Sequence, residues 1–253
     1  MKHTLPCLIA FLLILAIPPA WASPRVDLAV VDRASGQWIA SMRHRGQQWI
    51  EGEPGRSYAI RLTNTTGRRV LVVLSVDGVN AITGETAASA QTGYVLEPWQ
   101  STQVEGWRKS MRQVARFVFT DLAHSYAART GRPDNVGVIG VAVFEEARPS
   151  MWEPPVAYES RDDAARASSA APAREESRAQ SIGTGHGPRE WSPAQRTEFV
   201  RASTTPAETT ELRYDAYDAL VARGVIPRPY RVASDRPRAF PAEFVPDPPG
   251  GDW

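Results

Sequence analysis

Asp121 and His124 are the first residues whose types and spacing could carry out chemistry. They lie three residues apart on a predicted helical turn, and side chains at that spacing share one face of a helix. A carboxylate beside an imidazole can fix the tautomer of the ring, which prepares it to act as a general base. A hydrolase also needs an exposed nucleophile, and no Gly-x-Ser-x-Gly sequence occurs in the chain. The pair is therefore a weak catalytic candidate, and a capping or surface role is favoured.

The glycine-rich stretch Gly183–Gly187 holds a second imidazole, that of His186. Loops that bind phosphate through glycine follow a buried strand and open a helix, whereas this stretch follows polar, low-complexity sequence and runs into Pro188. We expect a flexible or docking loop. If His186 met Asp121 and His124 in one pocket, the three would form a non-standard hydrolase site, and this hydrolase is one alternative function. The spacing of the histidines does not indicate a metal site, so we expect no metal and no cofactor.

Trp99 and Trp107 are the candidate ligand-binding residues. Trp99 lies in a predicted turn and Trp107 at the end of a predicted strand, where aromatic rings can stack on sugars. A carbohydrate-binding module is therefore a second alternative, and it requires both rings to be exposed. Packing in the core is the usual role of so large a side chain. The long loop Val79–Thr92 is the other expected contact surface, because long loops in compact domains commonly carry function.

Asp77 and Gly78 form a predicted tight turn just before this loop. The side-chain oxygens of Asp77, Asn80 and Glu85 are ligands that calcium accepts, but their spacing fits no known calcium-binding loop. Hydrogen bonding of the Asp77 carboxylate within its own turn is the favoured interpretation.

Residues 1–22 have the features of a secretory signal peptide. A basic start at Lys2 precedes an apolar run, a proline break and an Ala-x-Ala site, which predicts cleavage before Ser23. We expect a periplasmic or secreted protein of a Gram-negative bacterium. The apolar run is shorter than the roughly 20 residues of a spanning helix, and no later segment is apolar enough, so we expect no transmembrane segment after cleavage.

The composition of the chain after Ser23 excludes several classes of function. The only cysteine, Cys7, lies in the predicted signal peptide, so disulfides, thiolate nucleophiles and cysteine-bound metals are excluded. Loss of Lys2 leaves 28 basic against 28 acidic residues, a net charge of zero. Because a basic excess is missing, we expect no nucleic-acid partner. A protein or glycan partner remains open.

Short strands at regular spacing predict a mainly β chain with an antiparallel β-sandwich over residues 25–147. Residues 57–63 alternate between apolar and polar side chains, and the apolar run 69–76 follows after Asn64–Gly67. These two strands are predicted to form a hairpin in which Gly67 takes a positive φ. The other expected elements are a hairpin over 93–107, a helical turn over 122–129 and a fully buried last strand over 136–144.

The sequence changes in character at Pro149. Residues 148–181 are rich in Pro, Ala, Ser, Arg and Glu without an apolar period, which predicts a low-complexity linker that cannot order itself. Beyond it we expect a small α+β C-terminal appendage over residues 182–230, packed back on the sandwich. Its expected elements are a hairpin pairing 196–202 with 208–214, a helix that ends at Gly224, and then a proline-rich tail over 231–253.

Several segments resemble those of a group of secreted proteobacterial proteins with no assigned function. The resemblance covers residues 57–144 and, more weakly, 182–227. The chain is similar to that family in the segments Arg68–Asn80, Thr92–Leu96, Gly106–Ser110, Tyr126–Gly140 and Gly183–Gly187. The resemblance implies a secreted location and supplies no activity.

The leading hypothesis for function is a non-enzymatic binding or scaffold protein of the bacterial envelope. It follows from the missing thiol, the few histidines and the missing catalytic motifs. The long loop Val79–Thr92 and the segment carrying Trp99 and Trp107 are the expected contact surface.

Overall fold

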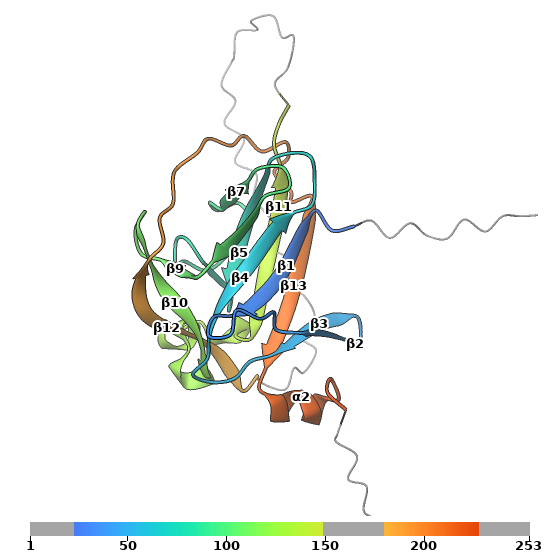
Figure 1. Cartoon of the computed structure of the whole chain (residues 1–253), viewed down its shortest axis with the longest axis vertical. Helices are drawn as coiled ribbons and strands as arrows, with labels where there is room; N and C mark the ends of the chain where they lie inside the picture. The colour runs from blue at the N-terminus through green and yellow to red at the C-terminus, as the bar shows by residue number, and fades with distance from the viewer. Residues whose placement is uncertain (1–22, 149–179, 228–253) are drawn as a thin grey trace, which may run out of the picture.

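The structure, a computed structural model, describes residues 23–148 and 180–227. It confirms the predicted fold class, because these residues form a mainly β protein in which two sheets pack face to face (Figure 1). The signal peptide, most of the predicted linker and the proline-rich tail lie outside the described residues. Within the described ranges no helix is long and apolar enough to cross a membrane.

Sheet A is antiparallel throughout, and β1 and β12 are at the two ends of its strand order. Its strands, in spatial order, are β1 (Val26–Asp32), β4 (Ser57–Asn64), β10 (Gln113–Asp121) and β12 (Ile182–Trp191). Two shorter strands extend it, β8 (Ser101–Val104) beside β4 and β9 (Gly106–Arg108) beside β10.

Sheet B is antiparallel except for one parallel pair, β3 with β13. Its strands, in spatial order, are β2 (Ser41–His44), β3 (Gln47–Glu51), β13 (Glu208–Asp215), β11 (Val138–Glu145), β5 (Val70–Val76) and β6 (Val79–Asn80). A further short strand, β7 (Tyr94–Leu96), also pairs with β5.

The core lies between the inward faces of the two sheets. Tyr58, Ile60 and Leu62 of β4 point into it, as their alternation with more polar residues predicts. From sheet B, alternate residues of β5 and β11 meet them, and Val72 and Val143 are fully buried. β5 is apolar on both faces because its outward residues are covered as well, by the chain between β12 and β13.

Two of the three predicted hairpins, those over 57–76 and 93–107, are wrong because the strands of each belong to different sheets. β4 pairs with β1, β8 and β10, whereas β5 pairs with β6, β7 and β11, so the chain crosses from sheet A to sheet B after Asn64. The Asn64 side chain holds this crossing by donating to the carbonyls of Arg68 and Glu97 at 2.7 and 2.8 Å. Gly67 does not take a positive φ. β7 and β8 are divided between the sheets in the same way.

The predicted C-terminal appendage is part of the sandwich itself. β12 extends sheet A beyond β10, and β13 lies inside sheet B between β3 and β11. The expected hairpin between 196–202 and 208–214 does not form, because β13 has both of its edges occupied by other strands. The sandwich therefore extends beyond the predicted boundary at residue 147.

The segment that joins β12 to β13 is held by arginine side chains. Arg69 donates to Thr197 and to the carbonyl of Glu198, and Arg201 donates to the carbonyl of Ser89. The Arg201 guanidinium also lies 4.1 Å from the centre of the Phe144 ring, a close cation–π contact on the outer face of sheet B.

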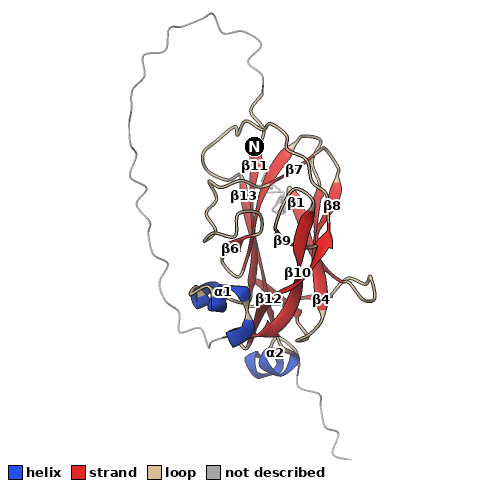
Figure 2. Ribbon diagram, turned by 90° about the vertical axis from the view of Figure 1, so that its left-hand side faces the viewer, coloured by secondary structure: helices blue, strands red, loops and turns tan. Residues whose placement is uncertain are grey.

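The helices are short and lie at one end of the sandwich, where α1 is close to β12 (Figure 2). The helical turns expected over 122–129 are confirmed, and α2 ends at Gly224 with a φ of 77°, as its glycine predicts. The helices are η1 (Leu122–His124), α1 (Tyr126–Arg129), η2 (Pro133–Asn135) and α2 (Tyr217–Arg223), where η marks a 3₁₀ turn.

A buried hydrogen-bonded chain links the two sheets at this end. The Asp77 carboxylate, in the turn between β5 and β6, accepts from the Gly137 and Thr184 amides at 2.8 and 2.7 Å and from the Tyr214 hydroxyl at 2.5 Å. The Thr184 hydroxyl lies 2.7 Å from the Tyr214 hydroxyl and 2.6 Å from that of Tyr58. Since the carboxylate accepts from Tyr214, the direction of donation runs from Tyr58 through Thr184 and Tyr214 to Asp77.

The sequence favoured hydrogen bonding of the Asp77 carboxylate within its own turn. The structure shows instead that its partners lie in β12, β13 and the connection before β11. Asp77 is fully buried, and its backbone takes a φ of 53° beside Gly78 at 72°. Positive φ at both central residues is the geometry of a two-residue type I′ hairpin turn, for which Asp-Gly is a preferred sequence. The turn aims the carboxylate inward, toward strands from both sheets.

We predict that Tyr214→Phe destabilises the protein by about 1–3 kcal/mol, because it removes one donor from a buried carboxylate and one partner from Thr184. Urea unfolding monitored by tryptophan fluorescence measures the loss. Tyr217→Phe is the matched control, since Tyr217 is 43% exposed on α2. Equal unfolding midpoints for the two variants would contradict a structural role for the chain of hydroxyls.

We also predict that the stability contributed by Asp77 depends on pH. Burial raises the pKa of its carboxyl from 3.8 to about 6, against hydrogen bonds that lower it. The folded state then binds the proton more tightly than the unfolded chain, so its stability falls as the pH rises from about 4 to above 6, by about 3 kcal/mol. Asp77→Asn should lack this loss. If the unfolding free energies of the wild type and the variant changed with pH in the same way, the predicted pH dependence from Asp77 would be wrong.

Candidate functional site

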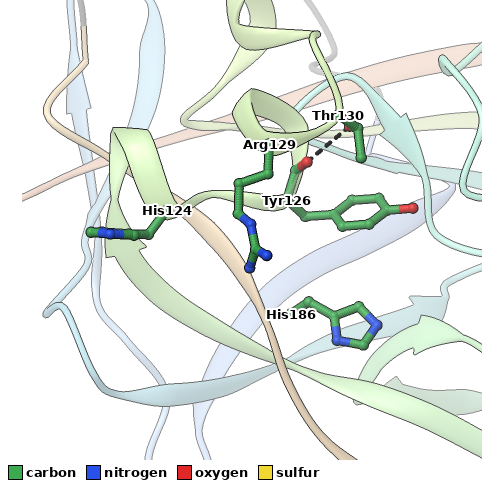
Figure 3. Close-up of a pocket in the computed structure, with 5 residues that line it drawn as sticks. All are labelled: His124, Tyr126, Arg129, Thr130 and His186. Atoms are coloured by element: carbon green, nitrogen blue, oxygen red, sulfur yellow. Dashed lines mark hydrogen bonds between the residues drawn. The ribbon is translucent and has the colours of Figure 1, made fainter.

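An open pocket lies between α1 and β12, and it brings together two of the three weak catalytic candidates. It has a volume of about 280 Å³ and is lined by His124, Tyr126, Arg129, Thr130 and His186 (Figure 3). We call it the α1–β12 pocket. None of its lining residues is acidic.

The helical turn of α1 fixes the first wall of the pocket. The Ser125 hydroxyl caps the turn by accepting from the Ala128 amide at 3.1 Å, and its side chain is fully buried. The Thr130 hydroxyl closes the other end by donating to the Tyr126 carbonyl at 2.8 Å. Ser125 therefore holds Tyr126 and Arg129 in place, and its buried hydroxyl is not available as a nucleophile.

The second wall is a strand, and the prediction of a flexible or docking loop over Gly183–Gly187 is wrong. Its glycines make room for neighbours: a Cβ on Gly183 would lie 2.5 Å from Val136, and one on Gly187 would lie 2.9 Å from the Arg116 carbonyl. Glycine in a strand marks such close approaches. β12 thus runs tightly along β10 and pairs His186 with Phe117.

The rings of Tyr126 and His186 form an aromatic pair across the pocket. Their centroids are 5.9 Å apart and their planes are inclined by 35°. Figure 3 shows the His186 ring close to the Tyr126 ring, whereas the His124 ring is turned away from both, with Arg129 between them. The two histidines therefore share the pocket without meeting.

Positive charge surrounds His186. Burial lowers the pKa of its imidazole, and the nearby cations of Lys109, Arg189 and Arg129 lower it further. The ring is consequently neutral at neutral pH, so that it can offer one nitrogen as a donor and the other as an acceptor. Permanent cations of the site are supplied by arginine and lysine.

Asp121 and His124 lie on one face, as their spacing predicts, but they form only a loose pair. The carboxylate oxygen and Nδ1 are 3.7 Å apart, too far for a hydrogen bond, and the two side chains are 73% and 75% exposed. Asp121 precedes η1 without capping it through its side chain. An exposed pair of this kind interacts weakly in water.

The two candidate tryptophans do not form a shared platform. Trp107 is 3% exposed and packs edge-on against Phe117, with ring centroids 5.2 Å apart. It therefore cannot stack on a ligand, because large aromatic side chains in a core are already covered. Its ring also lies 5.0 Å from that of Tyr126, so that Trp107 supports the wall of the pocket from behind. Trp99 is 68% exposed in the turn between β7 and β8.

The loop Val79–Thr92 is held by its own side chains. It begins with the strand β6, and the Asn80 side chain accepts from the Ile82 amide at 2.8 Å and donates to the Thr92 carbonyl at 3.2 Å. Arg132 ties the loop to the end of α1 by donating to the Gly84 carbonyl at 3.1 Å. The loop thus borders the region of the pocket.

The sequence analysis missed Arg129, Thr130 and Lys109 as parts of this site. Arg129 ends the predicted helical turn and Thr130 follows it, five and six residues after His124, and nothing in their spacing indicates a pocket. Lys109 lies on another strand connection, and only the pairing of β9 with β10 and of β10 with β12 brings it near His186. Long-range strand pairing is not readable from the local sequence.

The described residues contain no group of three or more His, Cys, Asp or Glu side chains that could hold a metal ion. No protein-family model, curated protein or solved structure matches the chain. The resemblance to secreted proteobacterial proteins stays a prediction. What defines the site is therefore its own chemistry, an aromatic wall with two imidazoles and one arginine, bordered by further cations.

We predict that Lys109→Gln raises the pKa of His186. The variant removes the charge of Lys109, which after burial is the largest cause of the lowered pKa. A pH titration of the imidazole signals by NMR spectroscopy measures it. Lys109→Arg is the control and should leave the titration midpoint close to that of the wild type, since it keeps the charge. A midpoint that does not respond to Lys109→Gln would mean that the lysine lies too far from the pocket to act on it.

Proposed function

We propose that this protein is an exported, non-enzymatic binding protein of the bacterial envelope, and that its ligand is an acidic glycan held in the α1–β12 pocket. One observation carries the proposal: the Tyr126 ring and the Arg129 guanidinium line one open pocket with His186, next to the cations of Lys109 and Arg189. Export is supported by the predicted signal peptide.

The chemistry of the pocket fits an acidic sugar. Aromatic rings such as that of Tyr126 stack on the apolar face of a pyranose, while an arginine fork bonds a carboxylate, sulfate or phosphate group. A neutral His186 can donate to one sugar hydroxyl and accept from another. Because the pocket is open, it suits a sugar unit within a longer chain rather than a small molecule enclosed on all sides.

Binding is better supported than hydrolysis. Glycoside hydrolysis uses two carboxyl groups on either side of the bond, and no carboxyl group lines the pocket. Acyl transfer needs a nucleophile beside a base, whereas the Ser125 hydroxyl is buried under its own helical turn. The alternative hydrolase around Asp121, His124 and His186 would require these groups to converge, and the His124 ring is turned away from His186 (Figure 3).

The carbohydrate-binding alternative is retained in this form with different residues. Trp107 is buried, so the sugar-stacking role passes from the tryptophans to Tyr126. A protein partner with an acidic side chain at its surface is the remaining candidate for the same pocket. The two ligands differ in one requirement: only the glycan has an apolar sugar face that stacks on the Tyr126 ring.

We predict that the protein without its signal peptide binds uronate-, phosphate- or sulfate-bearing glycans on an array and does not bind neutral glycans of the same length. Titration calorimetry with a bound oligosaccharide should show that Arg129→Gln weakens binding about tenfold, the loss expected for one charge-assisted hydrogen bond. His186→Gln should weaken it by less, since a neutral hydrogen bond is lost.

Arg43→Gln is the matched control, because Arg43 is exposed on β2, at the opposite side of the molecule from β10 and β12 (Figure 1). It should bind like the wild type. Neutral glycans that bind as tightly as acidic ones, or an Arg129→Gln protein with unchanged affinity, would refute the proposal. Substrate turnover that is lost on His124→Ala would favour the hydrolase instead.

A further inference from the structure

A second surface with a distinct composition lies at the free end of sheet A. There the turn Lys109–Arg112 joins β9 to β10, and β12 ends beside it with Arg189 and Trp191. Figure 1 shows these strands at the left-hand margin, away from the β2–β3 hairpin on the right. We call the side chains of Lys109, Met111, Arg112, Arg189 and Trp191 the flap tip.

The flap tip has a fixed backbone. The Ser110 hydroxyl accepts from the Arg112 and Gln113 amides at 3.2 and 3.1 Å, which closes the turn. The chain after β12 then bonds to the same turn, since the Ala194 amide donates to the Met111 carbonyl at 2.8 Å. The side chains of the flap tip are therefore presented by a rigid support rather than by a mobile loop.

Two large apolar side chains of the flap tip face solvent. Trp191 is 65% exposed and Met111 is 39% exposed, although most apolar residues of comparable size in the described chain are buried. The Arg112 guanidinium lies 6.0 Å from the centre of the Trp191 ring. An exposed tryptophan beside an arginine is the combination that enters the interfacial layer of a membrane, where the indole sits at the level of the lipid headgroups.

The charge around these side chains is strongly positive. Segments 105–116 and 186–196 contain six arginines and lysines against two carboxylates. Those two carboxylates, Glu105 and Glu190, both pair with Arg33, and Glu190 pairs with Arg116 as well. Lys109, Arg112 and Arg189 are exposed, and none of them forms an ion pair within the part of the chain that the structure describes. The chain as a whole has a net charge of only +1, so this excess is local.

We infer that the flap tip docks the protein on an anionic phospholipid surface. Trp191 and Met111 enter the headgroup layer, and Lys109, Arg112 and Arg189 bind the lipid phosphates around them. Charge complementarity favours a membrane over an apolar protein groove, since three exposed cations would be left without partners in such a groove. The binding is peripheral and weakens with salt, because much of it comes from exposed charges.

Co-sedimentation of the protein without its signal peptide with lipid vesicles tests the inference. The protein should bind mixed phosphatidylglycerol–phosphatidylcholine vesicles and not pure phosphatidylcholine vesicles, and added salt should release it. Trp191→Ala should weaken binding about tenfold, because the variant has no aromatic side chain to transfer from water into the headgroup layer. Arg112→Gln should weaken it about fivefold, the effect of one basic residue near a charged membrane.

Trp38→Ala is the matched control, because Trp38 is 60% exposed and also lies near an arginine, with Arg61 at 5.6 Å from its ring centre. This variant should bind vesicles like the wild type. Arg129→Gln separates the inference from the proposed function, since this pocket variant should bind acidic glycans more weakly, as stated above, and bind vesicles like the wild type. The inference is overturned if the wild type ignores anionic vesicles, if Trp38→Ala and Trp191→Ala weaken binding equally, or if Trp191→Ala lowers only the affinity for acidic glycans.

Discussion

The hydrogen bonds to the buried Asp77 carboxylate are the interaction on which the rest of the structure depends. A carboxylate in the core is costly unless all its partners are in place, and these partners come from β12, β13 and the connection before β11. The two sheets can satisfy it in one relative position only. The same strand that supplies the Thr184 amide carries His186 two residues further on, so that the core interaction also fixes one wall of the α1–β12 pocket.

Positive and negative charges are nearly equal in number in this protein, but they are unevenly distributed over its surface. The basic and acidic residues nearly balance over the chain, yet Lys109 and Arg189 of the flap tip also act electrostatically on His186 in the pocket. Several other arginines are paired with carboxylates, as Arg33 and Arg116 are with Glu190. A near-neutral protein can therefore present one cationic face without the self-repulsion that a high net charge would cause.

The sequence predicts the strands well and their pairing poorly. Alternation of apolar residues locates β4, because side-chain periodicity is local. Pairing is set by where the chain crosses between sheets, and the turn at Asn64 has the composition of a hairpin while acting as such a crossing. For the same reason the sequence finds the candidate site only in part: it names His124 and His186, whereas Trp107, a stacking candidate only if its ring is exposed, is buried by strands that are distant in the sequence.

The position of β13 governs the order in which this chain can fold. In sheet B, β13 lies between β3 and β11, so these two strands lack a neighbour until β13 is in place. β13 is synthesised more than sixty residues after β11. Closing so long a connection is an entropic cost that the first strands cannot offset by themselves. Sheet B therefore stays incomplete until β13 has been synthesised, and the sandwich forms only once nearly the whole polypeptide is available.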